Sequence, residues 1–103
     1  MQQITIELQE NTANKFNSYI KLFGTKDIMF NKFISFHINR LKREISRMQT
    51  ELDKYEKKYD MKTSDFYNVF DAGKMGDKKD FMLWAGIYEL QKDSKIKLNE
   101  ISL

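Results

Sequence analysis

The sequence predicts a mainly helical protein with a single N-terminal strand, assembled as a dimer. Residues 3–8 alternate apolar and polar side chains, which is the pattern of a half-buried strand. The rest of the chain spaces its apolar residues as helices do, and it contains no proline that would interrupt a long helix. A chain of 103 residues buries only a modest core by itself, so a second copy would add to it.

The strand segment reads QITIEL and has two different faces. Its apolar face is made by Ile4, Ile6 and Leu8, and its polar face by Gln3, Thr5 and Glu7. A lone strand leaves backbone N–H and C=O groups unpaired, and the sequence offers no second strand to bond them. We therefore expect the same strand of a second copy to pair with it, antiparallel about a two-fold axis.

Two helices are predicted to follow the strand. The first covers residues 11–23, with Asn11 as its N-cap and Gly24 just beyond its end. Thr25 is expected to cap the second helix, which has no break until about Asp60.

The second helix changes character along its length. Residues 28–38 are apolar on nearly every side, which predicts burial on every side. The predicted dimer core comprises Ile4, Ile6, Leu8, Phe30, Phe33, Ile34 and Ile38.

From residue 34 onward the apolar residues of this helix are confined to one stripe with heptad spacing, which we call the seam. The seam is made by Ile34, Ile38, Leu41, Ile45, Met48, Leu52, Tyr55 and Tyr59. A parallel two-stranded coil is disfavoured, because it would place Glu51 against Glu56. The seam is expected to be covered by the chain's own tail or by another protein.

The remainder of the chain is predicted to form two short helices and a frayed end. Ser64 would cap the first, which Gly73 ends, and Asp77 with Asp80 would open the second as a capping box. Residues from about Asp93 onward are expected to fray. Large apolar side chains lie in stripes on these helices, namely Phe66, Tyr67, Phe70, Phe81, Trp84, Ile87 and Tyr88. They either cover the long helix or anchor a partner protein.

Nothing in the sequence indicates catalysis. His37 is the one histidine, and its apolar neighbours favour a core or interface position. We find no catalytic triad, metal-ligand spacing or phosphate-binding loop, and the absence of cysteine excludes disulfides and thiolate metal sites. We expect no enzyme activity, cofactor, metal or small-molecule substrate. No membrane span or signal peptide is recognised, so a cytoplasmic location is expected.

The strand–helix–helix order over residues 3 to about 45, with Thr25 and Lys26 opening the second helix, resembles the ribbon-helix-helix DNA-binding family. The resemblance implies a two-stranded ribbon in the major groove, read through Gln3, Thr5 and Glu7. It also implies a phosphate held at the helix start by Thr25 and Lys26. Glu7 departs from the family, whose members often carry a cation there.

A cluster of basic residues lies further along the long helix, at Arg40, Lys42, Arg43 and Arg47. In the family geometry this stretch is distant from the ribbon. We interpret it as a solvated face or a partner contact rather than a DNA contact. The net charge of +3 and the pI near 9.0 permit nucleic-acid binding without requiring it.

The end of the long helix, EKKYDM, is followed by the pattern FY..F.AG..GD..DF..WA..YE. This region looks like the C-terminal part of small prokaryotic antitoxins. The resemblance implies a type II antitoxin: a head, residues 1–45, that dimerises and binds operator DNA, and a tail, residues 46–103, that neutralises a toxin. Two alternatives are a stand-alone repressor of the same fold and a dimeric helical adaptor with no DNA role.

Overall fold

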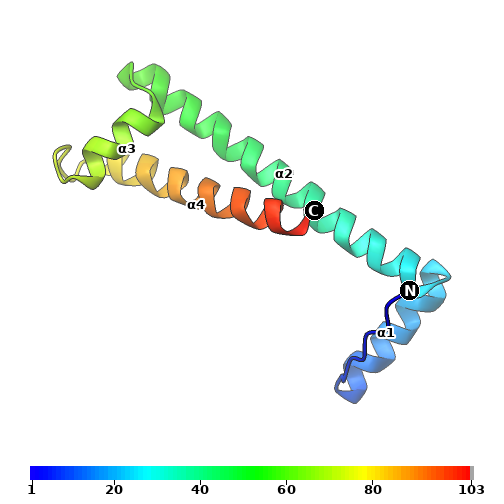
Figure 1. Cartoon of the computed structure of the whole chain (residues 1–103). Helices are drawn as coiled ribbons and strands as arrows, with labels where there is room; N and C mark the ends of the chain where they lie inside the picture. Colours follow the sequence, from blue (N-terminus) through cyan, green and yellow to red (C-terminus); the bar gives the residue numbers. More distant parts are fainter. Residues whose placement is uncertain (103) are drawn as a thin grey trace. The chain divides into compact units, whose positions relative to one another are not determined.

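The computed structural model describes residues 1–102, and in that range it contains four helices (Figure 1). They are α1 (Glu10–Phe23), α2 (Lys26–Tyr59), α3 (Thr63–Asp71) and α4 (Lys79–Ile101). The chain divides into two compact units, residues 1–36 and the residues from 37 onward. From here on, the head is residues 1–36, not the residues 1–45 of the antitoxin resemblance, and the hairpin is the second unit. Helix α2 contributes to both.

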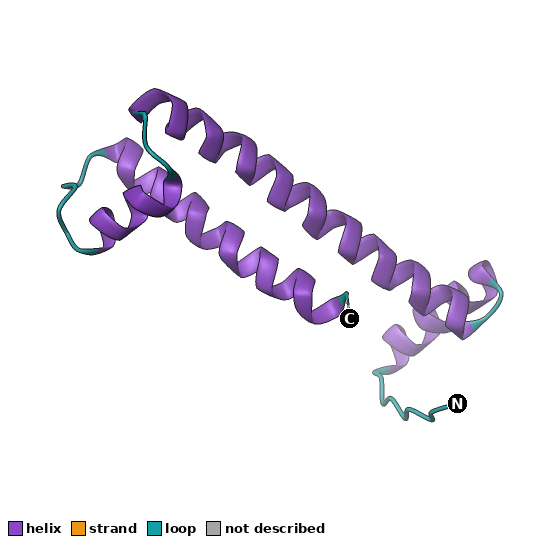
Figure 2. Ribbon diagram, turned by 45° about the horizontal axis from the view of Figure 1, so that its top comes forward, coloured by secondary structure: helices purple, strands orange, loops and turns teal. Residues whose placement is uncertain are grey.

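The predicted N-terminal strand is absent. Residues 1–9 form an irregular segment whose side chains are all exposed, and residues 1–102 contain no strand (Figure 2). The predicted ribbon, and with it the ribbon-helix-helix fold, is therefore wrong. The period-two pattern describes side chains only. A strand also needs a backbone partner and a surface for its apolar face, and this segment has neither within the chain.

The junction of α1 and α2 confirms the predicted stop and start signals. Gly24 has a φ of 96°, and its N–H donates to the carbonyl oxygen of Ile20 at 2.8 Å. Glycine alone adopts such a φ without a steric penalty, so the helix ends here. The hydroxyl oxygen of Thr25 then accepts the N–H of Ile28 at 3.1 Å and caps α2.

The other predicted caps are wrong. Asn11, Ser64 and Asp77 were expected at helix starts, but the N-cap positions are held by Gln9, Lys62 and Lys78, none of which caps through its side chain. Contacts between helices occur at two of these starts. Glu56 of α2 accepts the first N–H of α3, and Asp80 bonds to α2 instead of closing a capping box.

The predicted frayed end is also wrong, because α4 continues to Ile101. Within its last turns Lys97 pairs with Asp93, Nζ to Oδ2, at 3.0 Å. An ion pair four residues apart supports a helix but contributes only about 0.3–0.5 kcal/mol. The continuation of α4 makes it one of the two long arms of the hairpin.

In the hairpin, α4 lies alongside the C-terminal half of α2, and α3 occupies the closed end (Figures 1 and 2). The buried core residues are Leu52, Phe66, Trp84 and Ala85. Partly buried side chains surround them: Tyr55, Tyr59, Met61, Tyr67, Phe70, Met75, Phe81, Ile87 and Tyr88. The seam of α2 from residue 52 onward is thus covered by the chain's own tail, one of the two expected alternatives.

Candidate functional site

The closed end of the hairpin is organised around Trp84. Its ring stacks on Phe66 with centroids 3.8 Å apart and an angle of 4° between the ring planes. Tyr55 stacks against it at 5.7 Å, and both Trp84 and Phe66 have no exposed surface. Aromatic rings bury large areas, so this stack ties α2, α3 and α4 together.

A buried polar chain links the same three helices. The indole N–H of Trp84 donates to the hydroxyl oxygen of Thr63 at 3.0 Å. That hydroxyl donates in turn to Oε2 of Glu56 at 2.8 Å, and the Thr63 N–H donates to the same oxygen at 2.9 Å. In the described part of the chain no buried side-chain nitrogen or oxygen lacks a partner, so hydrogen bonds offset the cost of desolvating these polar groups.

Gln91 sets the alignment of α4 on α2. It is buried, with 2% of its surface exposed. Its Nε2 donates to Oε1 of Gln49 at 2.9 Å and to the carbonyl oxygen of Ile45 at 3.3 Å. Sliding α4 by one turn would leave these groups unpaired in an apolar interface, which fixes the register of the two arms.

At the rim of the hairpin, Asp80 accepts hydrogen bonds from Lys58 Nζ and from the Tyr59 hydroxyl. The pKa of Asp80 lies below its ordinary value, and the largest cause is the hydrogen bond from Lys58, with the hydrogen bond from Tyr59 as the second. On the other side the hydroxyl of Tyr67 donates to Glu89 at 2.6 Å, and chiefly for this reason the pKa of Tyr67 rises to about 12. Because these groups are solvated, their bonds contribute little to stability. The Asp80 bonds connect α2 to α4, and the Tyr67–Glu89 bond connects α3 to α4.

The seven predicted toxin-binding side chains are brought together, but into this core. Phe66 and Trp84 are buried, and Tyr67, Phe70, Phe81, Ile87 and Tyr88 are half-buried. A partner would reach Trp84 only if the hairpin opened, so a contact through it stays a prediction. The accessible apolar residues of α4 are different ones, including Met82, Leu83 and Leu90, which are 58%, 47% and 62% exposed.

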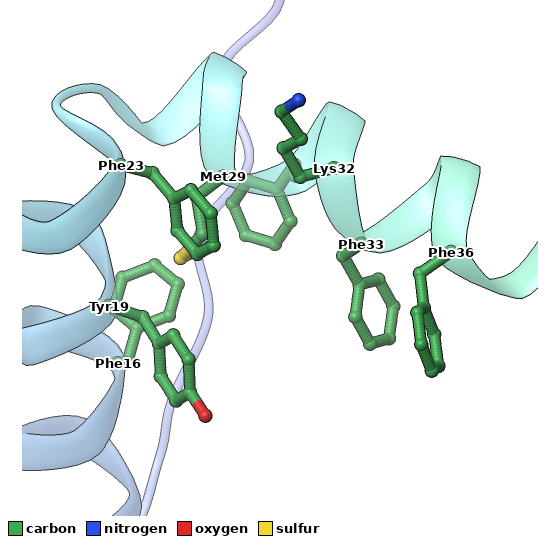
Figure 3. Close-up of a pocket in the computed structure, with 8 residues that line it drawn as sticks. Phe16, Tyr19, Phe23, Met29, Lys32, Phe33 and Phe36 are labelled. Atoms are coloured by element: carbon green, nitrogen blue, oxygen red, sulfur yellow. The ribbon is translucent and has the colours of Figure 1, made fainter.

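The head contains an apolar groove of about 740 Å³ between α1 and the start of α2. Figure 3 shows rings from both helices around one space, while Lys32 points away from it. The lining residues are Phe16, Tyr19, Phe23, Met29, Phe30, Lys32, Phe33 and Phe36. Such a concave apolar surface is suited to contact with another apolar body.

The predicted dimer-core residues lie in this head or just beyond it, and most are exposed. Ile4, Ile6, Leu8, Phe30, Phe33 and Ile34 are 37–78% exposed, and Ile38 is half-buried. Met29 is the one buried residue among residues 1–36, all of which are described. The head therefore leaves most of its apolar side chains in water.

The predicted DNA-binding residues are not assembled into a site. Gln3, Thr5 and Glu7 are exposed on the irregular N-terminal segment, so no ribbon presents them on one face. The hydroxyl of Thr25 is used to cap α2, and Lys26 is exposed in the first turn.

His37 is exposed, so the core alternative predicted for it is wrong, while a position in an interface stays a prediction. Among residues 1–102 no group of three or more histidine, aspartate or glutamate side chains is placed to hold a metal ion. The same residues include no helix with the length and apolar character needed to cross a bilayer.

Sequence reasoning missed several residues that build these features. Thr63 and Gln91 are polar residues whose burial no pattern indicates, because it depends on which helix faces them. Tyr19 and Met29 of the groove carried a signal, since both lie in stretches with apolar residues at helical spacing.

Comparison with models of known families, with curated proteins and with solved structures finds no match for this chain.

Proposed function

We propose that the protein is a non-enzymatic binding protein, which forms a homodimer through its head and holds a protein partner on its hairpin. One observation supports this most strongly: the head exposes an aromatic groove and buries a single side chain. A unit of this kind gains stability only when another surface covers it.

A second copy of the head is the occupant that the observations favour. Ten large apolar side chains in residues 4–36 are 37–78% exposed. Four of the ten are aromatic, and an aromatic side chain buries about 150–250 Å², so a partner that covers most of the ten would approach the roughly 800 Å² per partner of a standard interface. Two heads, each far below the size that folds alone, would then share one core.

The charge of the head also permits self-association. Residues 1–36 carry four lysines against three carboxylates, so two copies approach with little net repulsion. The lysine at the groove, Lys32, points away from the apolar space (Figure 3). Its charge would stay in water at the rim while the rings make contact.

The narrower proposal is that the hairpin's partner is a small protein toxin, so that the chain acts as an antitoxin. The support is the pattern of residues 66–89 that resembles antitoxin tails. Since the aromatic residues of that pattern build the core, the contact surface would be the side of α4 that exposes Leu83 and Leu90, where Leu90 lines a hollow shared with α2. A general adaptor without a toxin is the alternative on the same surface.

Light scattering during size-exclusion chromatography tests the dimer. The wild-type chain is expected at twice its 12.4 kDa mass. Phe33→Asp, at a groove residue that is 60% exposed, should give monomers. Leu90→Asp is the matched control, since it adds the same charge on a 62% exposed hairpin position, and it should stay dimeric. A wild-type monomer at micromolar concentration would refute the dimer.

Growth rescue tests the antitoxin proposal. The product of the neighbouring gene is expected to arrest growth when expressed alone, and co-expression of this chain should restore growth. Leu83→Asp with Leu90→Asp should abolish the rescue while leaving circular dichroism unchanged, because both side chains lie outside the core. A neighbour that is harmless alone would leave the adaptor as the function.

A further inference from the structure

The outer side of α2 in the hairpin carries a row of cations. On a helix of 3.6 residues per turn, Arg43, Arg47, Lys54 and Lys57 fall on one side, within roughly a third of the circumference. All four are exposed. The uncharged Asn39, Ser46 and Thr50 lie on the same side, and they are exposed as well. We call these seven residues the cationic row.

The row itself contains no carboxylate. The carboxylates beside it are hydrogen-bonded to other side chains of α2. Glu44 accepts from Arg40 at 3.2 Å, and Asp53 accepts from Gln49 at 2.8 Å. Glu51 accepts from Lys54 of the row at 3.1 Å. Glu44 and Glu51 are thus paired with cations, while Asp53 keeps its negative charge because Gln49 is neutral, and the row with these neighbours stays net positive.

Three of the cations have no internal role. In the described part of the chain no hydrogen bond or ion pair engages Arg43, Arg47 or Lys57. By contrast, Lys58 on the neighbouring side of the helix is paired with Asp80. Structural stability does not explain the charges of the row, so an external anion is the natural partner.

We propose that the cationic row binds the phosphate backbone of a nucleic-acid duplex. Arg43 and Lys57 are 14 residues apart, which corresponds to about 21 Å along the helix. Duplex DNA presents one negative charge per ~1.7 Å of its axis, so several phosphates fall within that span. The side chains of Asn39 and Ser46 can add hydrogen bonds to phosphate oxygens, as such residues commonly do, whereas the Thr50 hydroxyl already donates to the carbonyl oxygen of Ser46 at 3.1 Å.

The composition of the row argues against other polyanions. A helix that lies on a membrane surface needs an apolar face to insert, and the apolar face of α2 here is covered by α3 and α4, with Leu52 only 1% exposed. A single strand is bound largely by stacking its bases on aromatic rings, and the row contains no aromatic residue. An acidic protein would need apolar anchors, and beside the row these are limited to the hollow that Arg47 lines with Met48 and Leu90.

Binding of a duplex through the row requires neither the proposed dimer nor a toxin, and the row meets the proposed toxin surface only at the hollow shared by Arg47 and Leu90. It concerns residues 39–57, which belong to the hairpin, and the Arg40–Arg47 cluster was interpreted from sequence as a solvated face or partner contact. The ribbon-based DNA contact through Gln3, Thr5 and Glu7 plays no part in it.

Fluorescence anisotropy with a labelled duplex of ~25 base pairs, measured from about 50 to 200 mM salt, tests the proposal. Wild-type protein is expected to bind at low salt, with an affinity that falls steeply as salt rises. The double variant Arg43→Gln/Arg47→Gln should reduce the slope of log affinity against log salt by about 2, because two phosphate contacts are lost. It should also weaken binding about tenfold or more at the lowest salt.

The matched control is Lys79→Gln/Lys95→Gln on α4, which removes the same charge from exposed positions outside the row. It should leave affinity and slope close to wild type. Glu51→Gln frees Lys54 from its ion pair and should strengthen binding by a few-fold. Circular dichroism of each variant confirms that the helices are intact.

Four outcomes would overturn the proposal. They are no binding of the duplex at about 50 mM salt; equal losses in the row variant and the α4 control; tighter binding to a single strand of the same length; and stronger association with phosphatidylserine vesicles than with the duplex. The second outcome would mean that net charge, not the row, attracts the duplex. The last would identify an anionic membrane as the partner.

Discussion

At the scale of single residues, the hairpin depends on polar groups placed inside an apolar interface. Thr63 satisfies both the Trp84 indole and the Glu56 carboxylate, and Gln91 bonds two groups of α2. Each such bond contributes little net stability when intact, but an unpaired buried group costs about 1–3 kcal/mol. These residues therefore select one arrangement of the helices over others more than they add to its total stability.

Replacing Thr63 with valine tests this role. Valine keeps the shape of the side chain but removes the hydroxyl, which leaves the buried Trp84 N–H without an acceptor. We expect the free energy of unfolding to fall by about 1–3 kcal/mol. Urea unfolding followed by the fluorescence of Trp84, the one tryptophan, measures the change.

Thr63→Ser is the control for this substitution. Serine keeps both hydrogen bonds and loses only a methyl group, worth about 1 kcal/mol. If valine is tolerated as well as serine, the buried polar chain has no structural importance.

The raised pKa of Tyr67 gives a prediction at alkaline pH. Its hydroxyl donates to Glu89, which favours the neutral form in the folded protein, with a pKa of about 12 against an ordinary 10.0. The stabilisation by this bond is fully present below pH 10 and is lost as the pH rises toward 12. Absorbance titration of tyrosinate should show a late step that Tyr67→Phe removes.

Glu89→Gln should move that step to lower pH, since the amide oxygen is a weaker acceptor without a negative charge. A late step that persists in Tyr67→Phe would assign it to another tyrosine. A late step that Glu89→Gln does not move would show that Glu89 is not its cause.

At the scale of the elements, the helices are delimited by local chemistry in one place and by tertiary contacts elsewhere. Gly24 and Thr25 separate α1 from α2 by backbone geometry and a side-chain cap, both of which are local. At the start of α3, Glu56 of α2 binds the Thr63 N–H, and in the first turn of α4, Asp80 is bonded to Lys58 and Tyr59 of α2, so both starts involve another helix.

Two glycine substitutions with opposite expected effects test this distinction. Gly24→Ala forces alanine to a φ of 96° and should destabilise the head by about 1–2 kcal/mol. Gly86→Ala lies inside α4, where an added Cβ meets nothing within 4 Å, and should stabilise the hairpin by about 0.5–1 kcal/mol. Thermal unfolding by circular dichroism measures both. Equal effects of the two substitutions would refute the assignment of Gly24 as a conformational stop.

At the scale of the whole molecule, the two units differ in how much they bury. The hairpin contains a core of stacked rings that is closed by its own helices, whereas the head buries Met29 alone. The hairpin thus has what an independent domain needs, and the head does not.

A fragment comprising residues 37–103 is therefore expected to fold alone. It should be helical and unfold cooperatively, and its Trp84 emission should match that of the full chain, because every ring around Trp84 lies within the fragment. Residues 1–36 alone should show little helix when dilute. A fragment 37–103 without cooperative unfolding would contradict the division into units.

The sequence by itself determined the helical class, the junction at Gly24 and Thr25, and the apolar seam of α2, since each follows from local backbone chemistry or from helical periodicity. It left open whether Trp84 and Phe66 pack on the long helix or anchor a partner, and it did not reveal that Asp80 bonds to α2 or that residues 3–8 stay unpaired. Those features depend on which surfaces meet. Only the tertiary structure decided them, because the periodicity of apolar residues indicates which face of a segment needs a contact but not which other segment provides it.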